Sequence, residues 1–113
     1  MYLTCTRVSK INRINFTQRF QDSDIDEVEQ QIASAIQGKN SKVIIDLSEL
    51  RHISCKVVVM LTGLCESLQK REGSLVLLKP SKEFISIFRE NQLTTDCVMS
   101  FSLLSALNLL SRV

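Results

Sequence analysis

The sequence predicts an α/β protein that folds as a single domain over residues 1–113. Short apolar runs bounded by polar or breaker residues, at 43–47 and 74–78, are typical of strands buried on both faces of a sheet. Longer segments between them carry apolar residues every three or four positions, which indicates amphipathic helices. Strands that alternate with helices predict right-handed crossovers and a mixed, mostly parallel sheet covered by helices.

The chain opens with two predicted strands, "YLTCTRV" and "INRINFTQRF", joined by a hairpin around Ser9 and Lys10. Residues 21–40 predict a helix whose apolar face is formed by Ile25, Val28, Ile32 and Ile36. Ser23 and Asp26 have the spacing of a capping box at its start, and Gly38 is the expected stop.

Six elements follow in strict alternation. The strand at 43–47 ends near Asp46, a helix at 54–71 is closed by Gly73, and a strand follows at 74–78. Ser81 caps a short helix, an edge strand lies at 97–101, and a helix ends the chain. The residues expected to face the core in these helices are Val57, Leu61, Leu64, Leu68, Phe84, Phe88, Leu103, Leu107 and Leu110. The predicted order is β-β-α-β-α-β-α-β-α, with about five strands and about four helices.

Composition excludes several classes of protein. A formal net charge of +2, without a basic cluster, does not indicate nucleic-acid binding. No apolar run approaches the roughly 20 residues of a membrane span, and the N-terminus lacks the apolar stretch of a signal peptide. We therefore expect a cytoplasmic protein without direct membrane insertion.

The residues for several common chemistries are also missing. The three glycines are dispersed, so no phosphate loop is predicted, and His52 is the sole histidine. His52 lies two residues from Ser54, a spacing that rarely gives a catalytic triad. The four cysteines form no C-x-x-C pair, so we expect Cys5, Cys65 and Cys97 to be thiols packed as small apolar groups. We expect no enzyme, cofactor or metal site.

A polar break at 51–57, "RHISCKV", separates a predicted strand from a predicted helix. The surrounding segment "VIIDLSELRHISCKVVVMLTGL" resembles the STAS domain of bacterial anti-sigma-factor antagonists, in which Asp-Leu-Ser precedes Ile-Asp-Ser-Ser-Gly-Leu at a helix start. The later segments "REGSLVLLKPSKEFISIFRENQL" and "SFSLLSAL" resemble the same family. The resemblance covers nearly the whole chain and implies the same order of strands and helices.

The resemblance implies a non-enzymatic module for partner switching in transcription regulation. By the same resemblance, such a module docks a serine-kinase-type anti-sigma factor or a related regulator. Phosphorylation of a serine at the helix start then releases the partner. The docking residues implied here are His52, Ser54, Cys55, Lys56 and Val57. Cys55 stands at the acceptor position, whereas Ser54, Lys56 and Val57 replace the family's Asp, second Ser and Gly.

Alternatives remain open at this stretch. Ser54 is either a helix cap or a displaced phosphorylation site. Cys55 is a neutral replacement or a redox-sensitive thiol, and Lys56 reaches solvent or attracts an acidic partner. At the level of function, the alternative is a structural STAS subunit of a lipid-transport ATPase complex.

Overall fold

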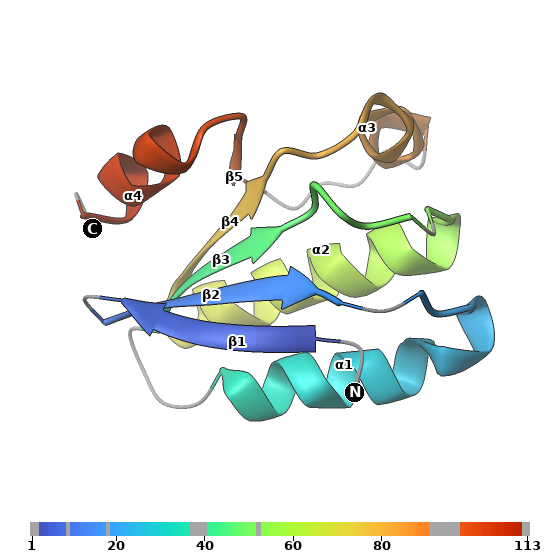
Figure 1. Cartoon of the computed structure of the whole chain (residues 1–113), viewed down its shortest axis with the longest axis horizontal. Helices are drawn as coiled ribbons and strands as arrows, with labels where there is room; N and C mark the ends of the chain where they lie inside the picture. The colour runs from blue at the N-terminus through green and yellow to red at the C-terminus, as the bar shows by residue number, and fades with distance from the viewer. Residues whose placement is uncertain are drawn as a thin grey trace.

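The structure is a computed structural model that describes residues 3–8, 10–17, 19–36, 41–51, 53–90 and 98–111. Its centre is one sheet with the strand order β1-β2-β3-β4-β5 (Figure 1). The first pair is antiparallel and the three other pairs are parallel. The strands are β1 (Leu3–Val8), β2 (Ile11–Phe16), β3 (Lys42–Asp46), β4 (Ser74–Leu78) and β5 (Val98–Ser100).

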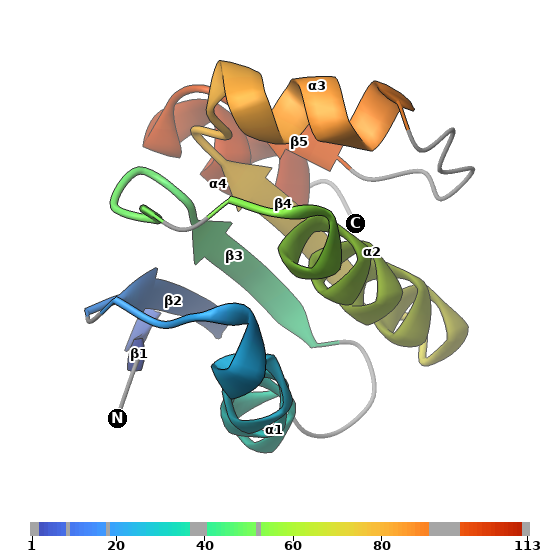
Figure 2. The same cartoon turned by 90° about the vertical axis from the view of Figure 1, so that its right-hand side faces the viewer.

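Helices cover both faces of the sheet. α1 and α2 lie side by side on one face, with α3 against α2, and α4 covers the other face over β4 and β5 (Figures 1 and 2). The helices are α1 (Ile25–Ala35), α2 (Cys55–Lys70), α3 (Lys82–Glu90) and α4 (Leu103–Ser111), and a short 3-10 helix, η1 (Asp22–Asp24), precedes α1. The predicted order of strands and helices is confirmed.

The hairpin between β1 and β2 is confirmed, but the second strand is shorter than predicted. Val8 pairs with Ile11, and Lys10 has a left-handed φ of 68° at the turn. β2 ends at Phe16, and the chain then turns so that the Phe20 ring stacks on Phe16 with 5.7 Å between ring centroids. Phe20 therefore joins the core from a loop and not from a strand.

The central strands have buried side chains on both faces, as their continuous apolar runs predict. In β3, Val43 and Ile45 face the core beneath α1 and α2, while Ile44 faces α4. Cys65 packs in the first of these cores as expected. Cys5 does not, because it lies on the edge strand β1, where its side chain is exposed. Cys97 lies outside the described residues.

Two predicted helix ends differ from the structure. The expected capping box of Ser23 and Asp26 is wrong, because Asp24 caps this region by accepting a hydrogen bond from the Gln21 backbone N–H at 2.9 Å. At the end of α2 the left-handed residue is Glu72, with φ 61°. Gly73 is needed for close packing instead, since a Cβ there would lie 2.9 Å from the Ser41 carbonyl oxygen. Gly38 lies outside the described residues.

Candidate functional site at the start of α2

The polar break predicted from the sequence lies at the edge of the sheet where β2, β3 and β4 have their carboxyl ends. In open α/β sheets this edge is the usual place for binding sites, because the connecting loops there lie next to one another. The connection from β3 to α2 crosses this edge beside the segment that contains η1 (Figure 2).

Asp46, at the end of β3, fixes the first turn of this connection. Its carboxylate accepts hydrogen bonds from the Ser48 hydroxyl at 2.6 Å and from the Ser48 backbone N–H at 2.9 Å. Arg13 of β2 donates to the same carboxylate at 2.7 Å, as an ion pair. Although Asp46 is only 7% exposed, these donors satisfy its charge and hold the chain as it leaves the sheet.

The environment of Asp46 acts on its pKa in two opposing ways. Burial is the largest single effect and raises the pKa of this carboxyl group. The hydrogen bonds from Ser48, together with the hydrogen bond and charge of Arg13, act in the other direction and hold the pKa of Asp46 below its ordinary value. The ionised form of Asp46 is therefore the form that stabilises this turn.

Ser54 is the N-cap of α2 and also bridges to a distant part of the chain. Its backbone is extended, with φ −143° and ψ 168°, and its hydroxyl oxygen accepts from the Val57 N–H at 3.4 Å. The same hydroxyl donates to Asp22 Oδ1 at 2.7 Å. Asp22 belongs to η1, so one side chain joins the start of α2 to the segment before α1.

The predicted docking residues differ in how far they reach solvent. Cys55 and Lys56 are exposed in the first turn of α2, and Ser54 is half-buried. The Val57 side chain is fully buried in the core, so it holds the helix start in place from below. His52 lies outside the described residues.

Sequence reasoning missed two members of this site. Val59 is 48% exposed and lies three and four residues after Lys56 and Cys55, which places the three side chains on one helix face. The run Val57-Val58-Val59 gives no sign of which valine is outside. Asp22 is the second missed member, because no local sequence pattern indicates its bond to Ser54.

We call the surface formed by Ser54, Cys55, Lys56 and Val59 the α2-start surface. It combines one cation, one thiol and one apolar side chain on a helix end that is fixed by Asp22 and by the core. Within the described residues, no cluster of three acidic, histidine or cysteine side chains is placed to hold a metal ion. The described helices also include none that is long and apolar enough to cross a membrane.

The family of the chain follows from a family model. The model of the STAS domain matches residues 13–100, from within β2 to the end of β5, and this range includes the α2-start surface. This chain belongs to the STAS domain family. No curated protein sequence matches this STAS domain significantly.

Solved structures share its fold at low sequence identity. An anti-sigma-factor antagonist (STAS) domain protein from Planctomyces limnophilus has a TM-score of 0.81 at 16% identity, covering 96% of this chain and 97% of that one. The Bacillus cell-fate determinant SpoIIAA in its phosphorylated form has a TM-score of 0.67 at 17% identity, over 95% and 97% of the two chains. The murine anion transporter Slc26a9 contains a similar domain, with a TM-score of 0.78 at 10% identity, over 96% of this chain and 19% of the transporter.

Proposed function

We propose that this STAS domain is a non-enzymatic regulatory module that docks a protein partner through the α2-start surface. The partner is a serine-kinase-type anti-sigma factor or a related regulator, and the module acts by partner switching. The observation that carries the proposal is the exposure of Cys55, Lys56 and Val59 on one face of a helix start. The likeness of the fold to anti-sigma-factor antagonists, such as the Planctomyces protein, supports it.

The chemistry of this surface suits docking better than catalysis. A binding surface needs a rigid platform with a few protruding anchors, and Val57 and the Ser54–Asp22 bond provide the rigidity. Lys56 supplies a cation that favours an acidic partner surface. His52 is the sole histidine in the chain and lies two residues from Ser54 in the sequence, a spacing that rarely gives a catalytic triad.

Affinity capture with mass spectrometry tests this proposal with a matched pair of variants. Lys56→Glu reverses the charge in the first turn of α2, and Lys82→Glu does the same in the first turn of α3, where Lys82 is also exposed. We expect wild type and Lys82→Glu to retain a kinase-type anti-sigma factor or related regulator, and Lys56→Glu to lose roughly tenfold in affinity, a typical cost for an interfacial charge. Equal retention by Lys56→Glu, or recovery of no such partner, would refute the proposal.

We further propose that Ser54 is the phosphorylation site of the module, since Cys55 occupies the acceptor position that the family resemblance implies. A phosphoryl group on Ser54 would replace the proton that is now donated to Asp22. It would bring roughly −1.5 to −2 units of charge next to the Asp22 carboxylate. Repulsion would then separate η1 from the start of α2 and change the docking surface.

Phosphorylation of Ser54 is tested by the intact mass of the protein after incubation with the captured kinase and ATP. An added phosphate that disappears in Ser54→Ala and persists in Ser81→Ala supports phosphorylation at Ser54. An unchanged mass shows that this kinase does not phosphorylate the module. Docking is tested separately, by affinity capture with Lys56→Glu and Lys82→Glu.

A second candidate function is a structural subunit of a lipid-transport ATPase complex, and a different surface favours it. The segment 98–111 has no charged residue, and it exposes Val98, Phe101 and Leu104 at 43%, 65% and 71%. The similar domain inside the Slc26a9 transporter supports a STAS domain as part of a membrane transport assembly. Co-purification with an ATPase that is lost in Leu104→Glu and kept in Lys56→Glu would establish this role, and the reverse pattern would reject it.

A further inference from the structure

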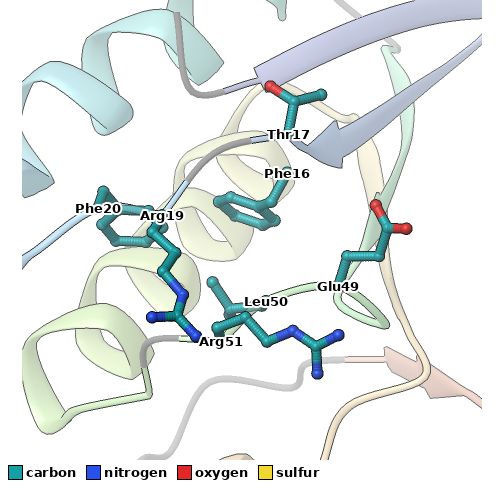
Figure 3. A pocket seen from close by; sticks show the side chains of 7 residues that line it. All are labelled: Phe16, Thr17, Arg19, Phe20, Glu49, Leu50 and Arg51. Carbon is teal, nitrogen blue, oxygen red and sulfur yellow. The ribbon is translucent and has the colours of Figure 1, made fainter.

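A separate hollow lies between the segment after β2 and the segment after β3, with a cavity volume of about 270 Å³ (Figure 3). Its apolar floor is formed by Phe16, Phe20 and Leu50, and Figure 3 shows the two aromatic rings beside each other there. Charged side chains form the rim, namely Arg19, Arg51 and Glu49. None of these residues belongs to the α2-start surface.

Within the part of the chain that the structure describes, the two guanidinium groups at the rim make no contact that holds the fold together. Arg19 and Arg51 are both exposed, and neither has an ion-pair or hydrogen-bond partner among the described residues. Arg13 shows the contrast, because it is bound to Asp46 at 2.7 Å. Among the described lining residues, Arg19 and Arg51 against Glu49 give one net positive charge. Guanidinium groups bind carboxylates and phosphates through paired N–H donors.

The floor adds a preference for a flat apolar group. Phe16 and Phe20 are stacked with an interplanar angle of 27°. They are only 3% and 5% exposed, so the hollow presents a small area of each side chain and not a broad apolar surface. Aromatic side chains pack well against another ring, and the small exposed area limits the apolar contact of a ligand to about one ring.

The size of the hollow sets the size of the ligand. Ligand pockets enclose roughly 300–1,000 Å³, and about 270 Å³ lies just below that range. One ring with one anionic group fits this volume. A second hollow of about 450 Å³ shares Arg19, Phe20 and Arg51 and continues to Gln21 and Asp24, so a substituent on the ligand has room in that direction.

We propose that this hollow, which we call the Arg19–Arg51 pocket, binds a small organic anion that consists of a flat ring bearing a phosphate or a carboxylate. The guanidinium groups hold the anionic oxygens, and the exposed parts of Phe16 and Phe20 contact the ring. The proposal does not depend on docking at the α2-start surface, and each can fail without the other.

NMR titration of the whole ¹⁵N-labelled chain tests the pocket with phenyl phosphate and benzoate as probes. Benzylamine is the control of opposite charge, and inorganic phosphate is the control without a ring. Arg19→Gln and Arg51→Gln remove one guanidinium each. Arg7→Gln is the matched control, because Arg7 is an exposed arginine on β1 away from the pocket. All three side chains are exposed, so the variants are expected to keep the fold.

We expect saturable shifts around Phe16, Phe20 and Leu50 with a dissociation constant on the order of 1 mM, typical of a ligand of this size. Each of Arg19→Gln and Arg51→Gln should weaken binding about tenfold, the loss of a charge-assisted contact, whereas Arg7→Gln leaves it unchanged. Tighter binding of phenyl phosphate assigns a phosphate ligand, and tighter binding of benzoate assigns a carboxylate. The proposal is overturned by no saturable shift, by equal binding of benzylamine or inorganic phosphate, or by an equal loss in Arg7→Gln.

Discussion

Two helices begin at the same edge of the sheet, each capped by a serine, but the two serines have different partners. Ser81 at the start of α3 is exposed and accepts from the Phe84 N–H at 3.1 Å, a bond within its own turn. Ser54 at the start of α2 makes the equivalent bond to Val57 and also donates to Asp22, which lies 32 residues earlier in the chain. A serine cap alone therefore does not mark a site, whereas the link to a second segment sets the start of α2 apart.

The connections that lead to the two helices differ in the same way. After β3, the side chain of Asp46 organises the turn through Ser48 and Arg13. After β4, main-chain groups organise the turn: the Lys79 N–H donates to the Ser100 carbonyl at 2.7 Å, and Lys79 has a φ of 55°. The α2-start surface thus depends on a few polar side chains, which makes this connection the more sensitive of the two to substitution.

The largest effect is expected for Asp46→Asn. The substitution removes the ion pair with Arg13 and the negative charge that Ser48 stabilises, so we expect a loss of about 3 kcal/mol in the free energy of unfolding. Urea unfolding measures this loss, and Glu29→Gln on the exposed face of α1 is the control for removing a carboxylate. A loss no greater than that of the control would show that the ion pair and hydrogen bonds of Asp46 do not add to the free energy of unfolding.

The same residue predicts how stability depends on pH. Because the pKa of Asp46 is lowered in the folded state, its contribution is fully present above the unfolded value of about 3.9 and is lost as the pH falls through the folded value. The difference in unfolding free energy between wild type and Asp46→Asn should be constant from about pH 5 to 7 and should shrink below about pH 4. A difference that grows on acidification would contradict the assigned direction.

The next largest effect separates the two caps. Ser81→Ala removes one local bond, at a cost of about 1 kcal/mol, whereas Ser54→Ala also removes a bond to a charged acceptor and should cost about 2 kcal/mol. Thermal or urea unfolding of both variants gives the comparison directly. Equal losses would mean that the bond to Asp22 adds no stability.

The smallest effect is the coupling between Ser54 and Asp22, which isolates the long-range bond. A double-mutant cycle of Ser54→Ala and Asp22→Ala should give an interaction energy of about 1 kcal/mol. The cycle of Ser81→Ala and Asp22→Ala is the matched control and should be additive within about 0.5 kcal/mol. Similar coupling in both cycles would indicate a general change in the fold and not a specific contact.

The fold was predictable because its signals are local in the sequence. The apolar runs of β3 and β4 and the periodic face of α2 each lie within one continuous segment, and all three are confirmed. Burial of Cys5 was wrongly predicted because strand composition does not show that β1 is an edge. The capping box of Ser23 and Asp26 was wrong because η1 precedes α1 and shifts the helix start to Ile25.

The site was less predictable, because its geometry depends on contacts between distant segments. The resemblance indicated the stretch 51–57, and Cys55 and Lys56 are exposed there. Neither the bond between Ser54 and Asp22 nor the exposure of Val59 follows from local spacing. Both depend on how η1 and the core meet the first turn of α2.

Hydrogen–deuterium exchange, with the captured partner added to the whole chain, shows which helix start the partner covers. We expect slower exchange in the peptide that covers residues 53–60, at the start of α2, and unchanged exchange in the peptide that covers 81–88, at the start of α3. Lys56→Glu should abolish the slowing, and Lys82→Glu should preserve it. Slower exchange confined to residues 98–111, or equal slowing at both helix starts, would contradict docking through the α2-start surface.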